Sequence, residues 1–210
     1  MEMKELAHIA IAVLMMFVVS AFAFVFNGNY LPLVQIFIFS VVIVAVPIVM
    51  KKAVAYSLDS RVEHSIWNVQ RYGFRERDKM KTPLPFGVIV PIIFTVFSSG
   101  IFKIMTFLTY DTQGLKHRAA RKFSFYSYTE MTDWHNGLIG AVGVLTLWII
   151  AIIGYLPGWE FMAKMAVYYA FWNMVPIAKL DGTQIYFGSR VLWAVFAVIT
   201  LIFAFYAFIL

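Results

Sequence analysis

A ten-residue stretch near the C-terminal end, residues 173–182, carries the polar groups best suited to chemistry in this sequence. It reads Asn-Met-Val-Pro-Ile-Ala-Lys-Leu-Asp-Gly and follows an apolar run. Pro176 ends a helix, Gly182 lets another backbone approach closely, and Asn173 and Asp181 supply oxygen ligands. These groups suit a ligand or ion site, but the spacing alone favours the alternative, in which Asp181 only caps the turn that follows.

Histidine is the other residue type that could bind a metal, because the chain has no cysteine. Glu63 and His64 match the last two positions of an inverted H-x-x-E-H zinc motif, but its first histidine is absent. Zinc held by His64, Asp181 and a distant histidine, either His117 or His135, is a second alternative. If no metal binds, His64 is a hydrogen-bonding side chain in a charged segment.

Two further patterns come close to a catalytic motif. Residues 4–8, Lys-Glu-Leu-Ala-His, have the spacing of H-E-x-x-H with a lysine at the first ligand position. Residues 98–100, Ser-Ser-Gly, lie in an apolar setting without a histidine in a predicted span to act as base, so we expect them to serve packing or a turn. The sequence shows no paired charges that a transporter would bury.

The elements that must position these residues belong to a membrane protein. Apolar residues make up 62% of the 210-residue chain and charged residues only 13%, whereas soluble domains have roughly 45–50% and about 25%. Aromatic residues, at 18%, suit a surface in contact with lipid. The net charge of +6 lies in loops that border apolar runs, so it indicates membrane topology and argues against nucleic-acid binding.

Apolar runs predict an all-α polytopic bundle. A helix needs roughly 20 apolar residues to cross the hydrocarbon core. A fifth run, Phe161–Ile177, contains Pro176 near its end and predicts a span with an interrupted end. The four longer runs are Ile9–Phe26, Leu31–Met50, Leu138–Leu156 and Leu192–Leu210.

The segment Pro85–Leu108 could either cross the membrane or turn back. Cytoplasmic loops attract the excess of Lys and Arg. If the segment crosses, the basic residues outside it divide ten against six; if it is re-entrant, they divide 15 against one. The count therefore favours five spans plus a re-entrant segment, with a cytoplasmic N-terminus, over six spans.

Residues 51–71 are expected to continue the second helix. Apolar residues recur there at three- and four-residue intervals among charges, and Gly73 would end the helix. No internal repeat or flexible linker is evident, so residues 1–210 are expected to form a single membrane-embedded domain.

The stretch Asn173–Gly182 resembles the N-x-x-P-x-x-x-L-D-G motif of the site-2 protease family, which are intramembrane zinc metalloproteases. Asn173, Pro176, Leu180, Asp181 and Gly182 match the motif in order and spacing. The helix after residue 136 is similar to the family's Gly-Pro-x-x-Asn helix, without its proline and asparagine. The stretch after His64 is similar to the one that follows the family's H-E-x-x-H. The resemblance covers most of the chain and is best to short archaeal members, which also have a re-entrant segment.

The resemblance implies a zinc site, but its central motif is missing here. In the family, two histidines one helical turn apart bind zinc, the glutamate between them is the base, and the L-D-G aspartate is the third ligand. When His64 is aligned with the second histidine, Ser60 stands at the first and Arg61 at the glutamate. Serine is a poor zinc ligand, and arginine cannot accept a proton. Only His64 and Asp181 remain as metal ligands.

A non-catalytic membrane homologue is therefore expected, with no cofactor, which binds or regulates a transmembrane client segment in the bilayer. The alternatives are an active zinc-dependent endopeptidase with unusual ligands and a small transporter or scaffold. Zinc is expected only if the family's activity is retained.

Overall fold

The computed structural model describes residues 3–71, 79–100, 103–115 and 131–209. The chain is mainly helical, with two small two-stranded sheets. Its helices are α1 (Met3–Phe26), α2 (Leu33–Ser57), α3 (Phe86–Phe97), α5 (Asp133–Tyr155), α6 (Glu160–Met174), α7 (Asp181–Gly188) and α8 (Arg190–Ile209). Its strands are β1 (Ser60–Ile66), β2 (Val69–Arg71), β3 (Lys79–Leu84) and β4 (Leu108–Gly114).

Four of the described helices, α1, α2, α5 and α8, are long and apolar enough to cross a membrane. They coincide with the four longest predicted runs, and the all-α class is confirmed. Helix α6, at the predicted fifth span, has only 15 residues, which is about 22 Å of helix. It ends at Met174, ahead of Pro176, as the sequence predicted. A helix of that length does not by itself span a bilayer.

The prediction of a helix over residues 51–71 is wrong beyond Ser57. Asp59 has a φ of 51°, which breaks the helix, and the chain continues as β1. Burial then alternates along β1, with Val62, His64 and Ile66 facing inward. A spacing of four residues, as between Val62 and Ile66, fits both a helical turn and two strand repeats, so the apolar pattern could not separate the two.

The segment Pro85–Leu108 folds back on itself. It contains α3 and a turn at Ser99 and Gly100, which have φ angles of 53° and 80°. The two ends of the segment both bind the backbone of Trp67. The Trp67 carbonyl accepts a hydrogen bond from the Gly87 N–H (2.9 Å), and the Trp67 N–H donates to Phe107 O (3.1 Å). Beyond Phe107 the chain pairs as β4 with β1, antiparallel. The segment therefore leaves and returns at the same level of the molecule.

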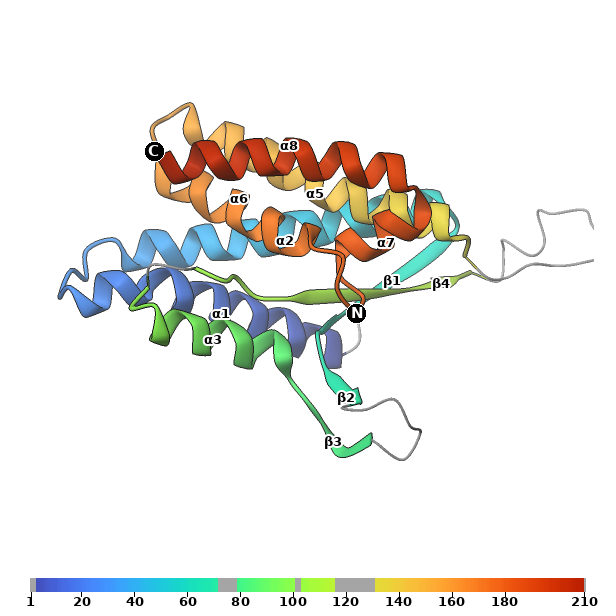
Figure 1. Ribbon diagram of the computed structural model, residues 1–210, viewed down its shortest axis with the longest axis horizontal. Coiled ribbons are helices and arrows are strands. Elements are labelled where there is room, and N and C mark those ends of the chain that lie inside the picture. Colours follow the sequence, from blue (N-terminus) through green and yellow to red (C-terminus); the bar gives the residue numbers. More distant parts are fainter. Residues whose placement is uncertain (1–2, 72–78, 101–102, 116–130, 210) are drawn as a thin grey trace, which may run out of the picture.

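The long helices run along one common axis (Figure 1). Helix α5 lies at the centre of the contacts, packed against α2, α6 and α7, while α1 packs on α2 and α8 on α6. The main apolar core is formed by α1, α2, α5 and α6. A second, smaller cluster, of Ala55, Val62, Tyr110 and Ile139, joins the end of α2 to the β1–β4 sheet and α5. This arrangement brings α7, the end of α2 and the sheet together around one polar site.

Candidate functional site

The stretch Asn173–Gly182 joins α6 to α7, with residues 173, 174 and 180–182 buried and residues 176–179 exposed. Asn173 is on the last turn of α6, Leu180 precedes α7 in extended conformation, and Asp181 is the first residue of α7. Asn173, Leu180 and Asp181 are 1–3% exposed. Asn173 Nδ2 donates to Tyr169 O (3.0 Å), while its Oδ1 has no partner in the described part of the chain. Asn173 and Asp181 are thus buried, whereas Lys179 in the same stretch is exposed and pairs with Asp111.

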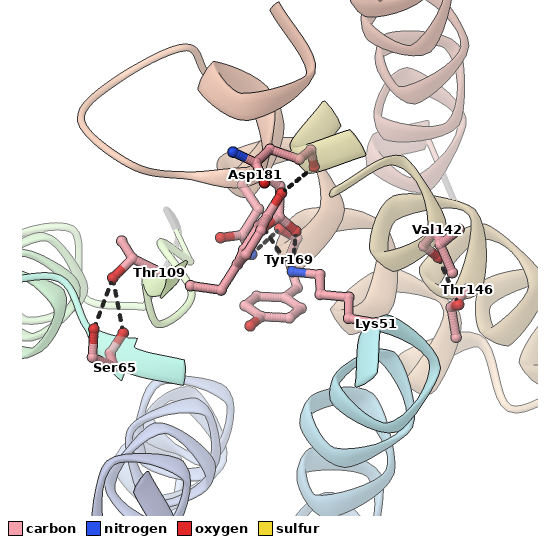
Figure 2. Close-up of polar contacts among 10 residues, drawn as sticks. Lys51, Ser65, Thr109, Val142, Thr146, Tyr169 and Asp181 are labelled. Carbon is pink, nitrogen blue, oxygen red and sulfur yellow. Dashed lines mark hydrogen bonds and ion pairs between the residues drawn. The ribbon is translucent and has the colours of Figure 1, made fainter. Parts of the chain in front are cut away.

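Asp181 is held by a lysine from α2. The Lys51 ammonium donates to both carboxylate oxygens, with Nζ–Oδ1 and Nζ–Oδ2 distances of 2.6 and 2.7 Å (Figure 2). Both side chains are almost wholly buried, at 7% and 4% exposed. Burial raises the pKa of Asp181, and the Lys51 charge opposes that rise. The carboxylate is therefore committed to an ion pair and does not cap α7, whose N-cap position has no side-chain hydrogen bond.

The neighbouring lysine, Lys52, is neutralised by a residue from the start of the chain. Glu5 Oε1 lies 2.7 Å from Lys52 Nζ and also accepts a hydrogen bond from the backbone N–H of His64 (3.1 Å). The His64 ring nitrogen Nδ1 lies 3.3 Å from the same oxygen. Two lysines on α2 thus meet two carboxylates, one from α1 and one from α7, and the formal charge of this cluster is zero when His64 is neutral.

His64 is buried beside these charges, and its ring is tilted against Tyr110 with centroids 6.3 Å apart. Burial, with the Lys51 charge, lowers the pKa of His64 from its ordinary 6.5 to about 3. His64 Nε2 has no hydrogen-bond partner among the described residues. The Tyr110 hydroxyl donates to Asn136 O (2.7 Å), and Lys51 Nζ lies 4.8 Å from the Tyr110 ring centre.

Each of the two predicted metal ligands has another partner in the structure. His64 contacts Glu5, and Asp181 contacts Lys51. Within residues 3–71, 79–100, 103–115 and 131–209, no three His, Asp or Glu side chains lie together as a metal site requires. His135 lies in the first turn of α5, bonded to Thr132, and His117 falls outside the described residues. Residues 4–8 and His64, which the sequence presented as two separate patterns, are in contact through Glu5.

Ser60 and Arg61 lie on β1 and not on a helix. Ser60 Oγ donates to Ala55 O (2.8 Å), and Arg61 lies 3.3 Å from Glu63. Successive strand residues point to opposite faces, so these positions cannot form the helical turn of an H-E-x-x-H motif with His64. That alignment of the motif is therefore wrong.

Lys51, Lys52 and Glu5 belong to the candidate site but were not predicted from the sequence as a group. No buried charge pair was expected from the sequence either, and the buried Lys51–Asp181 pair contradicts that. The available signal was the position of the two lysines, directly after a 20-residue apolar run and still within the helix. Lysines there are usually taken as the membrane boundary, because long side chains reach for the interface.

Gly182 is expected to tolerate no larger residue. A Cβ at this position would overlap the backbone carbonyl group of Met174, which cannot rotate away. We expect Gly182→Ala to destabilise the fold by about 1–3 kcal/mol through overpacking, measured by thermal unfolding in detergent. Gly154→Ala is the control, since its Cβ would meet Ala163 N at an ordinary 3.4 Å. Equal stability of the two variants would contradict the close approach of α6 and α7.

The buried His64 is expected to make stability pH-dependent. The pKa of His64 is about 3 in the folded chain and 6.5 in the unfolded chain. As the pH falls below 6.5, His64 therefore binds a proton in the unfolded chain but not in the folded chain. Stability present above pH 6.5 is then lost by up to about 1.4 kcal/mol per pH unit. Unfolding midpoints at pH 7.5 and 5.5 should differ more for the native chain than for His64→Gln. An equal change of the unfolding midpoint in the native chain and in His64→Gln would mean that His64 is in contact with solvent.

Comparison with family models, with curated proteins and with solved structures gives no match for this chain.

Proposed function

We propose that this protein is a non-catalytic integral membrane protein of the site-2 protease type, in which a lysine ammonium stands where the zinc ion would be. One observation carries the proposal. Asp181, which matches the third zinc ligand of the family, offers both oxygens to Lys51 Nζ at 2.6 and 2.7 Å. A tethered ammonium supplies one positive charge to the carboxylate, but it has no open coordination position for a water.

The contact also suggests where the missing motif lies. Lys51, Lys52 and Ala55 have the i, i+1, i+4 spacing of H-E-x-x-H and lie on one helix, α2. Lys51 and Ala55, one turn apart, are both buried on the side of α2 that faces the sheet and α5. In this alignment both histidine ligands and the general base are replaced, by two lysines and an alanine.

Peptide hydrolysis needs more than this site offers. Zinc catalysis uses around three protein ligands, a bound water whose pKa falls to about 7, and a base beside it. At the aligned positions the chain has two lysines and the methyl group of an alanine. We propose instead that the chain acts in the bilayer by binding or regulating a client transmembrane segment.

Metal analysis of the purified protein tests the proposal. We expect substoichiometric zinc and no cleavage of model transmembrane substrates by the unaltered protein. Chelator treatment should leave its unfolding temperature unchanged. Stoichiometric zinc that is lost in Asp181→Ala, together with chelator-sensitive cleavage, would establish the alternative, an active endopeptidase with unusual ligands.

The topology proposed with this function has a cytoplasmic N-terminus and a re-entrant segment at residues 85–108. The chain has no cysteine, so Lys81→Cys and Gln113→Cys each introduce a single thiol at an exposed position on either side of that segment. We expect an impermeant maleimide to label neither variant in intact cells and both after the inner face is opened. Labelling of Gln113→Cys alone in intact cells would mean that the segment crosses.

A small transporter is the second candidate, and the buried charges favour it. Two lysine–carboxylate pairs beside an uncharged His64 are groups that a proton pathway uses. Proton uptake into proteoliposomes, followed with a pH-sensitive dye, tests this candidate. Uptake by the native chain that is abolished in Lys51→Met/Asp181→Leu, a double variant expected to stay folded because neither charge remains buried alone, would support a transporter over the client-binding function.

A further inference from the structure

A polar cavity lies at the end of the molecule opposite to Lys51 and Asp181. It has a volume of about 270 Å³ and lies where α6 begins and α8 ends. Figure 1 shows the α1–α2 connection, the α5–α6 connection and the C-terminus at this same end. The residues that matter in its lining are Gly100, Lys103, Phe161, Lys164, Tyr168 and Phe208.

Two lysines share this cavity without a carboxylate. Lys103 Nζ lies 5.0 Å from the centre of the Phe161 ring, and Lys164 lies close enough for its charge to act on Lys103. Across the described ranges, neither lysine forms an ion pair, although Lys51, Lys52 and Lys179 each do. Burial, and then the Lys164 charge, lowers the pKa of Lys103. The pair is a concentration of positive charge that no carboxylate in the described part of the chain balances.

The position of the cavity says which anion would balance it. The ends of membrane-spanning helices lie at the level of lipid headgroups, where the abundant anion is phosphate. Lysine binds phosphate as a point charge, and aromatic rings suit this interface. Phe208 is 79% exposed, so the rim of the cavity opens onto the outer surface of α8, along which an acyl chain can lie. The volume is close to the lower end of small-ligand pockets, about 300 Å³, and suits a headgroup.

We propose that Lys103 and Lys164 bind the phosphate group of an anionic phospholipid, whose headgroup fills this cavity. The proposal is independent of the function suggested for Asp181. The lipid site formed by Lys103 and Lys164 lies at one end of the bundle. The ion-paired lysines of α2, Lys51 and Lys52, lie at the other end.

Thermal unfolding in nanodiscs tests the lipid site. We expect phosphatidylglycerol, added to phosphatidylcholine, to raise the unfolding temperature of the native chain by several degrees, as a ligand of the folded state does. The shift should vanish in Lys103→Gln/Lys164→Gln. In phosphatidylcholine alone this double variant should melt at or above the native temperature, because the repulsion between the two ammonium groups is gone. Lys81→Gln, at an exposed lysine outside the cavity, should keep the full shift.

The outcomes separate the site from its alternatives. A full shift in the double variant, or a shift equally lost in Lys81→Gln, would overturn the proposal. A full shift from inorganic phosphate in phosphatidylcholine nanodiscs would identify free phosphate as the ligand and overturn the lipid source. Failure of the double variant to fold would contradict the expected relief of repulsion. Native mass spectrometry should then still show less retained phosphatidylglycerol on Lys164→Gln than on the native chain, and equal retention would also count against the site.

Discussion

Lys51→Met is expected to destabilise the protein by about 3–5 kcal/mol, the largest loss expected for any single charge removed from this chain. The methionine keeps most of the volume of the side chain but leaves Asp181 buried, with no cation to donate hydrogen bonds to its two oxygens. An uncompensated carboxylate must then be desolvated at full cost or take up a proton. Reversible unfolding in detergent, followed by tryptophan fluorescence, measures the change.

Two further variants separate burial from charge pairing. Lys179→Met breaks the exposed pair with Asp111, whose N–O distance is also 2.7 Å, and should cost under about 1 kcal/mol because water screens it. The double variant Lys51→Met/Asp181→Leu should recover most of the stability, since neither charge remains buried alone. Equal losses for Lys51→Met and Lys179→Met would mean that the Lys51–Asp181 pair is open to solvent.

The triple variant Lys51→His/Lys52→Glu/Ala55→His is expected to bind zinc at close to one equivalent per chain. It writes H-E-x-x-H onto α2, where residue 51 already faces Asp181 and residue 55 is one turn further along the same face. Two imidazoles and one carboxylate make the usual protein part of a catalytic zinc site. Metal analysis after purification and gel filtration gives the stoichiometry.

The controls for this variant use the same scaffold. Asp181→Ala added to the triple variant should lower zinc retention, because the third ligand is lost. The variant Ser60→His/Arg61→Glu should retain none, because these residues are on a strand and do not form a helical turn with His64. Zinc binding by Ser60→His/Arg61→Glu, with none in the triple variant, would return the motif to His64 and refute the alignment on α2.

The long elements could be predicted because their evidence is local. An uninterrupted apolar run fixes a helix, and Pro176 fixes the end of α6. The turn back of residues 85–108 was also indicated, since the loops on both sides carry Lys and Arg. The strand at 60–66 was missed because apolar residues four apart fit either period, and pairing with β4, more than 40 residues away, decided between them.

The site could be predicted only in part, since its groups come from four separate segments. Asp181 carries a recognisable motif, but Lys51 is 130 residues earlier and Glu5 is 59 residues from His64. A search for metal ligands passes over lysine, because a lysine has no lone pair to offer while it is charged. The central contact of the site, the Lys51–Asp181 ion pair, therefore joins Asp181, which belongs to the motif, to Lys51, which does not.

The separation of Lys51 from its partner has a consequence during synthesis. Ribosomes add about 5–20 residues per second, so a gap of 130 residues leaves Lys51 without Asp181 for roughly 7–26 seconds. Lys52 has no such delay, because Glu5 is made before it. Until Asp181 has been made, α2 carries the Lys51 ammonium without its carboxylate partner. The ion pair at the end of α2 can thus form only after residue 181 of the 210 has been translated.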